Sequence, residues 1–286
     1  MMFKFLIQLA ILLICSPVLS GTLYVSNSNV SKNCSDNTID FSGEIRAGDS
    51  FAIEKIINDL KKKHGVEDCT NGWLTIRFGS DGGDVYEGIA IGKILRTNKL
   101  RAIVPFNSQC NSACVIAIAG AIRKDSIGSI GIHRPYFSKM DSNLNINQIK
   151  VERDKVNKAI GDYFRQVDIP LSLLDLMLSI PPEKMKVLNE SELELYRLNG
   201  VDANHEESEV AKLAKQFGLS SSEYRVKDAR ISAACKSKNG GFDFDCYHSR
   251  MLDISISEMK RRSEIAYTLC EKNLTNECFM KYLRQK

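Results

Sequence analysis

The sequence predicts an α/β domain with a mostly parallel sheet, followed by a small helical module that contains disulfide bonds. Short apolar runs alternate with stretches of helical periodicity up to about residue 200. Beyond Asp202 the chain becomes charged and poor in large apolar residues, yet it carries four of the nine cysteines. The 286 residues, 43% of them hydrophobic and 26% charged, are enough to bury a substantial core.

The first twenty residues, 1–20, have the features of a secretory signal peptide. Lys4 precedes an apolar run that ends at Ile14, and Ser20 offers a small residue for cleavage. The run is too short to cross a bilayer, and no later stretch has the roughly 20 apolar residues of a spanning helix. Lipidation at Cys15 is an alternative, but Ile14 stands where a small residue would be needed. We therefore expect a periplasmic or secreted protein, cleaved near Ser20.

Charge and histidine spacing exclude several classes of protein. The formal net charge is +4, from 39 basic and 35 acidic residues, which is too small to favour a nucleic-acid binder. No basic run is interleaved with aromatic residues. His64, His205 and His248 lack the spacing of metal ligands, so we expect them at the surface and expect no metal or other cofactor.

The first domain opens with two β-prone runs, 22–26 and 39–45. Asp49 or Ser50 is expected to cap a helix that ends at Lys63, because the apolar residues between them recur at helical spacing. Strands and helices then alternate as in β-α-β units. The expected elements are a buried strand at 73–78, a glycine-rich turn at 79–84, a helix at 85–95, a strand at 101–105, a helix of small residues at 112–121 and a strand at 129–133.

The remainder of this domain is expected to be helical almost throughout. Asn199-Gly200 would provide the C-cap of the last helix. The three expected helices are a long charged one at 146–167, a short apolar one at 171–178 and a third at 190–198.

A domain boundary is expected near residue 204. Charged residues dominate beyond it, and residues 238–241 (KNGG) form a clear break. We therefore predict a first domain at 21–204 and a cysteine-containing, mostly helical module at 205–286, whose small core needs disulfide bonds.

Loss of Cys15 with the leader leaves eight cysteines, and an even number in an exported chain favours disulfide bonds. Proximity along the chain suggests that Cys34 pairs with Cys69 and that the four C-terminal cysteines form two bridges. Zinc is the alternative for those four, but their spacings lack the paired short loops of structural zinc sites. The four residues are Cys235, Cys246, Cys270 and Cys278.

Three places carry residue types suited to chemistry: Gly82-Gly83, Ser112 and His133. Taken alone, each has an ordinary explanation as a tight turn, a helix N-cap or a packed histidine. Together they suit acyl transfer, since a serine hydroxyl needs a base to take its proton and backbone N–H groups to bind the oxyanion. Ser112 would open a helix, so the Ala113 amide is placed to donate, and Gly83 can bring a second N–H close. His133 would be the base.

Four segments are similar to those of one protein family. The glycine-rich turn at 79–88 (GSDGGDVYEG) resembles the Asn-Ser-Pro-Gly-Gly-x-Val-x-x-Gly signature of the proteolytic subunit of Clp protease, within the Clp/crotonase superfamily. The serine segment at 109–114 (QCNSAC) and the histidine segment at 132–135 (IHRP) resemble its nucleophile and Ile-His-Gln-Pro segments. Residues 189–202 resemble its late helix and Gly-Leu-Val-Asp ending. The resemblance extends over about 38–204.

The resemblance implies a spiral of β-β-α units with a helical arm, here at 146–167, that often mediates homo-oligomerisation. It also implies a serine peptidase acting on peptides or unfolded chains. Ser112 would be the nucleophile, His133 the base, and the amides of Gly83 and Ala113 the oxyanion hole.

The third member of the triad departs from this pattern. The position of the family's aspartate falls on Met185, whose thioether cannot orient an imidazole as a carboxylate does. Glu183 could substitute, a Ser-His pair could work with a backbone carbonyl, or the site could be weak or inactive. Asp81 replaces the family's proline, which we interpret as a local change in the turn. An exported protein has no ATP supply, so no ATPase partner is expected.

Cys110 and Cys114 flank Ser112 and lie four residues apart, so they would face each other across one helical turn. They are either two small buried residues or a disulfide bond that fixes, or redox-controls, the turn around the serine.

A Ser-Lys pair, as in related signal-peptide-peptidase families, is an alternative catalytic arrangement. It needs a lysine that loses its proton through burial, whereas the lysines after His133 lie in a highly charged stretch. His133 is therefore preferred. The three lysines are Lys150, Lys155 and Lys158.

Three functions remain open. The leading hypothesis is an exported Clp-like serine peptidase that works without an ATPase. The second is a weak or inactive member that serves as a scaffold or binding protein of the cell envelope, which Met185 favours. The third is an acyl-thioester enzyme of the coenzyme A branch, against which export argues because coenzyme A is cytoplasmic.

Overall fold

The computed structural model describes residues 21–27, 37–65, 74–136, 145–236, 241–270 and 276–284. The chain divides into two compact units, Met1–Asp202 and Ala203–Lys286. The predicted signal peptide lies outside the described residues, as do Cys34 and Cys69, so their pairing stays a prediction. Across the described ranges, no helix combines the length and the apolar character that crossing a membrane requires.

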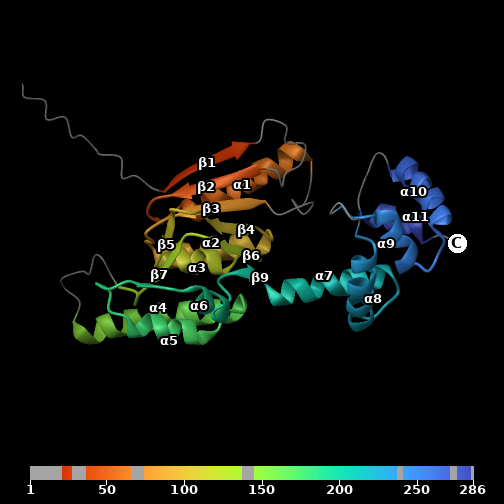
Figure 1. The fold of residues 1–286 in the computed structure, drawn as a ribbon. Coiled ribbons are helices and arrows are strands. Elements are labelled where there is room, and N and C mark those ends of the chain that lie inside the picture. The colour runs from red at the N-terminus through yellow and green to blue at the C-terminus, as the bar shows by residue number, and fades with distance from the viewer. Residues whose placement is uncertain are drawn as a thin grey trace, which may run out of the picture. The chain divides into compact units, whose positions relative to one another are not determined.

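The first unit is built on a six-stranded sheet with the order β1-β2-β3-β4-β6-β9 (Figure 1). The four central strands are parallel, whereas β1 and β9 run antiparallel at the two edges. The mostly parallel sheet is therefore as predicted. The strands are β1 (Thr22–Asn27), β2 (Asn37–Ser42), β3 (Thr75–Gly79), β4 (Arg101–Val104), β6 (Arg123–Ser126) and β9 (Gly200–Val201).

A second, three-stranded sheet has the order β5-β7-β8, with β5 (Gln109–Asn111) parallel and β8 (Lys186–Val187) antiparallel to β7 (Ser129–Ile132). Four strands, β5, β6, β8 and β9, were not predicted. Three of them have only two or three residues, and β6 reads Arg-Lys-Asp-Ser, which has no apolar alternation. Their pairing depends on partners that are distant in sequence.

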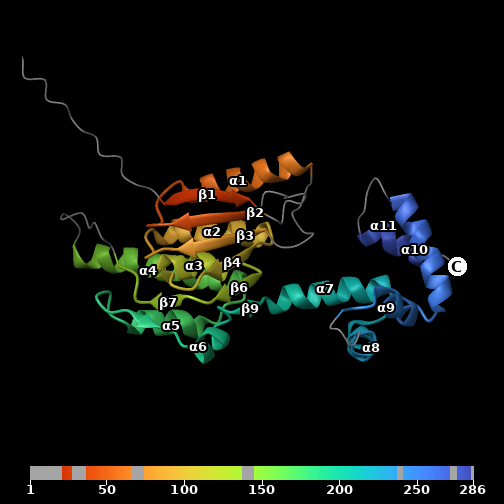
Figure 2. The same cartoon turned by 45° about the horizontal axis from the view of Figure 1, so that its top comes forward.

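The described residues of this unit form six helices, and all six were predicted. Figure 2 shows α4, α5 and α6 on the side of the unit opposite to α1. The mixed α/β class is thus established, while the spiral of β-β-α units and the role of α4 as an arm stay predictions. The helices are α1 (Asp49–His64), α2 (Val85–Thr97), α3 (Ala113–Ala119), α4 (Ile146–Gln166), α5 (Leu171–Ser179) and α6 (Glu190–Leu195).

Two helix ends differ from the prediction. Gly48, at φ 99°, caps α1 in place of Asp49 or Ser50, because the Asp49 carboxylate accepts a hydrogen bond from the Arg46 amide instead (2.7 Å). Helix α6 ends at Leu195, and Gly200 lies in β9 and forms no C-cap. The chain leaves the helix early so that Leu198, which is fully buried, can enter the core.

Helix α3 lies in the centre of this core. All seven of its residues are buried, as expected for a helix that is apolar on every side. Small residues let its neighbours come close: a methyl group added at Gly88 of α2 would lie 2.7 Å from the Ala113 carbonyl oxygen. The start of α3, next to Ser112, is therefore held by tight packing.

The second unit consists of helices in the described residues, with two small apolar clusters. Disulfide bonds join Cys235 to Cys246 and Cys270 to Cys278, which confirms the two bridges expected among the C-terminal cysteines. The histidines are less exposed than predicted: His64, in α1 of the first unit, and His205 and His248, in the second unit, are half-buried. The helices of the second unit are α7 (Ala203–Gln216), α8 (Ser221–Ala234), α9 (Phe244–Met251), α10 (Ile256–Cys270) and α11 (Asn276–Leu283).

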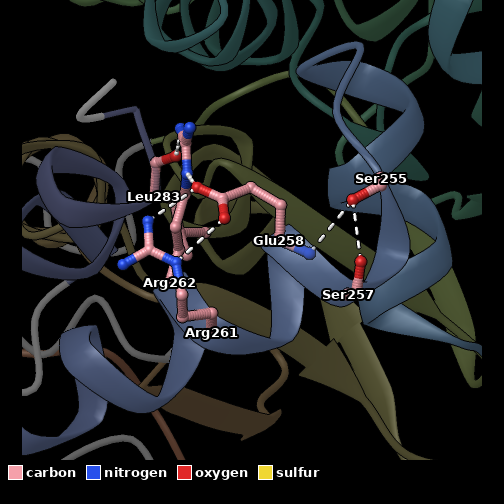
Figure 3. A network of polar contacts seen from close by, with 6 residues as sticks. All are labelled: Ser255, Ser257, Glu258, Arg261, Arg262 and Leu283. Carbon is pink, nitrogen blue, oxygen red and sulfur yellow. Dashed lines mark hydrogen bonds and ion pairs between the residues drawn. The ribbon is translucent and has the colours of Figure 1, made fainter.

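A polar network supports the last two helices of this unit (Figure 3). Glu258 of α10 accepts hydrogen bonds from Arg261 and Arg262. These bonds lower the pKa of the Glu258 carboxyl to about 2. Arg262 also donates to the carbonyl of Leu283 (2.9 Å), so one guanidinium connects α10 to the end of α11.

Lys124, on β6 of the first unit, is a buried cation. Its side-chain ammonium donates to the carbonyl of Ala121 (2.7 Å), and burial lowers its pKa from 10.5 to about 8. The unfolded chain therefore binds more protons than the folded protein between pH 8 and 10.5, and this group makes the free energy of unfolding increase with pH over that window.

We predict that Lys124→Met removes this increase. Between pH 7.5 and 10.5, the free energy of unfolding of the wild type should rise by roughly 2–3 kcal/mol relative to that of the variant. Urea denaturation at several pH values measures it, with Lys93→Met, at an exposed position of α2, as control. A difference that stays constant with pH would contradict the prediction.

Candidate active site

Ser112 occupies a sharp turn between β5 and α3, with φ 55° and ψ −119°. A residue with a side chain rarely adopts this conformation, and it persists only where the surroundings hold it. The Ser112 amide donates to the Gly131 carbonyl (2.8 Å) and its carbonyl accepts from the Val115 amide (3.0 Å). In the described part of the chain its hydroxyl makes no hydrogen bond. A strained strand-to-helix turn of this kind presents a serine hydroxyl away from the backbone.

The glycine turn lies directly against Ser112. A methyl group added at Gly82 (φ +100°) would come within 2.8 Å of the Ser112 Cβ and 3.0 Å of the Ala113 nitrogen. One added at Gly83 (φ +141°) would come within 2.1 Å of the Ile45 carbonyl oxygen. Only glycines allow this approach, so the structure brings together the glycine turn and the serine that the sequence singled out.

Two amides at this junction have no acceptor among the described residues. The Ile45 amide donates to the Gly82 carbonyl (2.7 Å), and the Asp84 amide donates to the Ile45 carbonyl (2.9 Å). Within the described ranges, neither Gly83 nor Ala113 donates a backbone hydrogen bond. Gly83 is an exposed residue, whereas Ala113 is buried.

Asp81 connects the glycine turn to β5. Its carboxylate accepts hydrogen bonds from the side-chain amides of Asn111 (3.2 Å) and Gln109. The Ser80 hydroxyl accepts from the Gly82 amide (3.1 Å), which fixes the turn from its other side. The sequence did not predict a role for Asn111, because its partner Asp81 lies 30 residues away and no local pattern indicates the contact.

His133 follows β7 and is buried, with 5% of its surface exposed. Its Nδ1 lies 2.9 Å from the carbonyl oxygen of Arg134. A carbonyl can only accept, so this hydrogen bond requires a proton on Nδ1 and leaves the lone pair on Nε2. Among the described residues, no hydrogen bond joins His133 to Ser112 or to Glu183.

The segment before β8 contains the position where a carboxylate was expected. Pairing of Ile132 with Lys186 brings this segment beside β7. A methyl group at Gly131 would lie 2.8 Å from the sulfur of Met185, so the thioether packs on β7 two residues before His133. Glu183 is exposed.

Cys110 and Cys114 form a disulfide bond, so of the two interpretations that the sequence left open, the bridge is present. Both cysteines are fully buried.

The lysines of α4 have the properties of a solvated face. The Lys155 side chain is 60% exposed and pairs with Glu152 (2.7 Å), which raises the pKa of Lys155. Lys158 is more exposed still and pairs with Asp162, and Lys150 is exposed. Where the structure describes the chain, no cluster of three or more His, Cys, Asp or Glu side chains is arranged to hold a metal.

No family model matches the chain, and no curated protein matches it. Among solved structures, a point mutant of ClpP1 from Listeria monocytogenes is similar, with a TM-score of 0.42 and 17% sequence identity. The match covers 57% of this chain and 88% of that chain. We therefore base the proposed function on the geometry around Ser112.

The contact between Gly82 and Ser112 can be tested with a matched pair of glycines. Gly43 has the same φ of +100°, but a methyl group there would approach nothing closer than 3.7 Å. Both Gly82→Ala and Gly43→Ala should lose about 1–2 kcal/mol of stability through backbone strain.

Gly82→Ala should lose a further 1–3 kcal/mol or so, because the methyl group displaces the Ser112 turn. Chemical denaturation of both variants measures the difference. Equal losses would show that Gly82 does not pack on Ser112 as described.

Proposed function

We propose that the chain is an exported serine hydrolase that cleaves peptide bonds with a Ser112–His133 pair. The observation that carries this proposal is the strained backbone of Ser112 beside two amides that have no acceptor in the described part of the chain. In the described structure the Ser112 hydroxyl makes no hydrogen bond, so the strained backbone serves no evident structural purpose there. Backbone strain of this kind is concentrated at functional sites.

In the proposed reaction His133 takes the proton of Ser112 through Nε2 as the serine oxygen attacks the substrate carbonyl. The amides of Gly83 and Ala113 donate to the developing oxyanion. This costs no reorganisation, because neither amide has an acceptor among the described residues beforehand. His133 then returns the proton to the leaving amine. Water completes the cycle by hydrolysing the acyl-enzyme with the same base.

The Arg134 carbonyl takes the orienting role of a third triad member in this proposal. It selects the tautomer with the proton on Nδ1, as a triad carboxylate would. It bears only a partial charge, so it stabilises the imidazolium less. Loss of a triad aspartate costs up to about 10⁴ in kcat, and we therefore expect a slow enzyme.

The substrate class follows from the resemblance of residues 79–88, 109–114 and 132–135 to Clp protease segments, which favours peptides or unfolded chains. An exported protein has no ATP supply, so this proposal includes no ATPase partner. The long helix α4 (Ile146–Gln166) is the proposed contact in a homo-oligomer. Disulfide bonds in both units are compatible with an oxidising compartment.

A second candidate is a scaffold or binding protein of the cell envelope that retains the site without using it. One observation favours it: Met185, not a carboxylate, packs beside the strand that leads to His133. The two candidates predict different reactivity of Ser112.

We predict that a fluorophosphonate probe labels the purified, oxidised protein at Ser112. Ser112→Ala should abolish labelling, and His133→Ala should slow it by at least about 10²-fold, the usual contribution of a general base. Intact mass and peptide mapping locate the adduct. No labelling of the folded wild type would favour the scaffold.

We also predict that Glu183→Gln leaves the labelling rate unchanged, because Glu183 is exposed and makes no hydrogen bond with His133 in the described structure. The rate is measured in parallel with the wild type. A loss as large as that of His133→Ala would instead make Glu183 the third member.

A further inference from the structure

The Cys110–Cys114 disulfide bond joins the two structural elements on either side of Ser112. Cys110 is the central residue of β5, and Cys114 is the second residue of α3. Their Cα atoms are 5.2 Å apart, and only three residues lie between them. The bridge therefore closes a very small loop with the strained serine at its middle.

Both ends of this loop are fixed to the core. Cys110 pairs with Ile130 of β7 on one side. On the other side it pairs with Ser80 in an isolated parallel β-bridge. There the Ser80 amide donates to the Gln109 carbonyl (2.8 Å), and the Asn111 amide donates to the Ser80 carbonyl (2.9 Å). Cys114 belongs to a helix whose residues are all buried. Any relaxation of the turn must therefore occur within residues 111–113.

A backbone at φ 55° and ψ −119° tends to relax towards ordinary conformations unless its ends are constrained. The hydrogen bond from the Ser112 amide to Gly131 restrains one side of the turn (2.8 Å). The disulfide bond restrains the separation of its ends, which a single hydrogen bond cannot do. Rotation of Ser112 to a relaxed conformation would move its hydroxyl and turn the adjacent Ala113 amide.

We propose that the Cys110–Cys114 disulfide is a positioning element of the Ser112 turn, so that the reactivity of Ser112 depends on oxidation of this pair. The inference rests on the proposed serine hydrolase function. The chain would be synthesised with two thiols and a turn that lacks this covalent constraint, and the site would mature only when the bond forms.

The maturation step is a thiol–disulfide exchange with a disulfide oxidant. One Cys thiolate attacks a sulfur of the oxidant, which forms a mixed disulfide and releases the first thiol. The second Cys thiolate then attacks the sulfur of the first cysteine, which forms the Cys110–Cys114 bond and releases the second thiol. The protein loses two electrons and two protons while the oxidant is reduced to two thiols. Because both cysteines are fully buried, the completed bond is protected from reductants that cannot open the core.

The test uses the full chain with Cys110→Ala/Cys114→Ala, and Cys235→Ala/Cys246→Ala as the matched control in the second unit. Cys235 and Cys246 also form a buried disulfide bond, with a sequence separation of 11 against 4 for Cys110 and Cys114, and they lie far from Ser112 in sequence. Fluorophosphonate labelling of Ser112 is measured against probe concentration, which separates the maximal labelling rate from probe affinity.

We expect the Cys110/Cys114 variant to lose at least tenfold in maximal labelling rate, with probe affinity and cooperative unfolding retained. The control should label at the wild-type rate. Hydrogen exchange of the 109–116 peptide should accelerate in the first variant and not in the control. A wild-type labelling rate in the Cys110/Cys114 variant, or unchanged exchange of this peptide, would overturn the proposal.

Should the double variant fail to fold, the control protein is refolded under reducing conditions and then oxidised with glutathione disulfide. Labelling should appear at the rate at which peptide mass spectrometry detects the Cys110–Cys114 bond, and labelling that precedes the bond would refute the positioning role. If the oxidised wild type does not label at all, the hydrolase function fails. Hydrogen exchange of the 109–116 peptide then still tests the positioning role, which predicts slower exchange after oxidation.

Discussion

Three contacts meet at the turn of Ser112, whose backbone has a positive φ. Gly131 of β7 accepts its amide, Gly82 packs on its Cβ, and the disulfide bond between Cys110 and Cys114 spans it. Each contact constrains the turn in a different direction, and none acts through the Ser112 hydroxyl. The contacts that restrain the backbone therefore do not occupy the hydroxyl, as the proposed chemistry requires.

This junction also explains why small residues surround the serine. Gly82 and Gly83 let the turn after β3 approach, and Gly88 lets α2 approach the first turn of α3. Added side chains at these positions would separate the elements that meet beside Ser112. The core packing and the proposed oxyanion site therefore depend on the same absence of side-chain volume.

The difference between the two candidate functions lies in one interaction. The Arg134 carbonyl orients His133 but supplies no full negative charge to stabilise an imidazolium. Met185 packs near the strand where a carboxylate would have supplied that charge. A hydrolase with this arrangement would be slow, whereas a scaffold would need the glycine turn and the strained serine only as inherited structure.

The sequence by itself predicted the α/β class, the six helices of the first unit, the two C-terminal disulfide bonds, and the segments that meet at the candidate site. Periodicity, small-residue runs and cysteine spacing are local patterns, so they can be recognised without coordinates. The tertiary structure alone decided the short strands β5 and β8, the bond between Asp81 and Asn111, the carbonyl beside His133 and the position of Met185. Most of these features depend on contacts between residues distant in the chain, and the Arg134 carbonyl is a backbone group whose direction no residue type encodes.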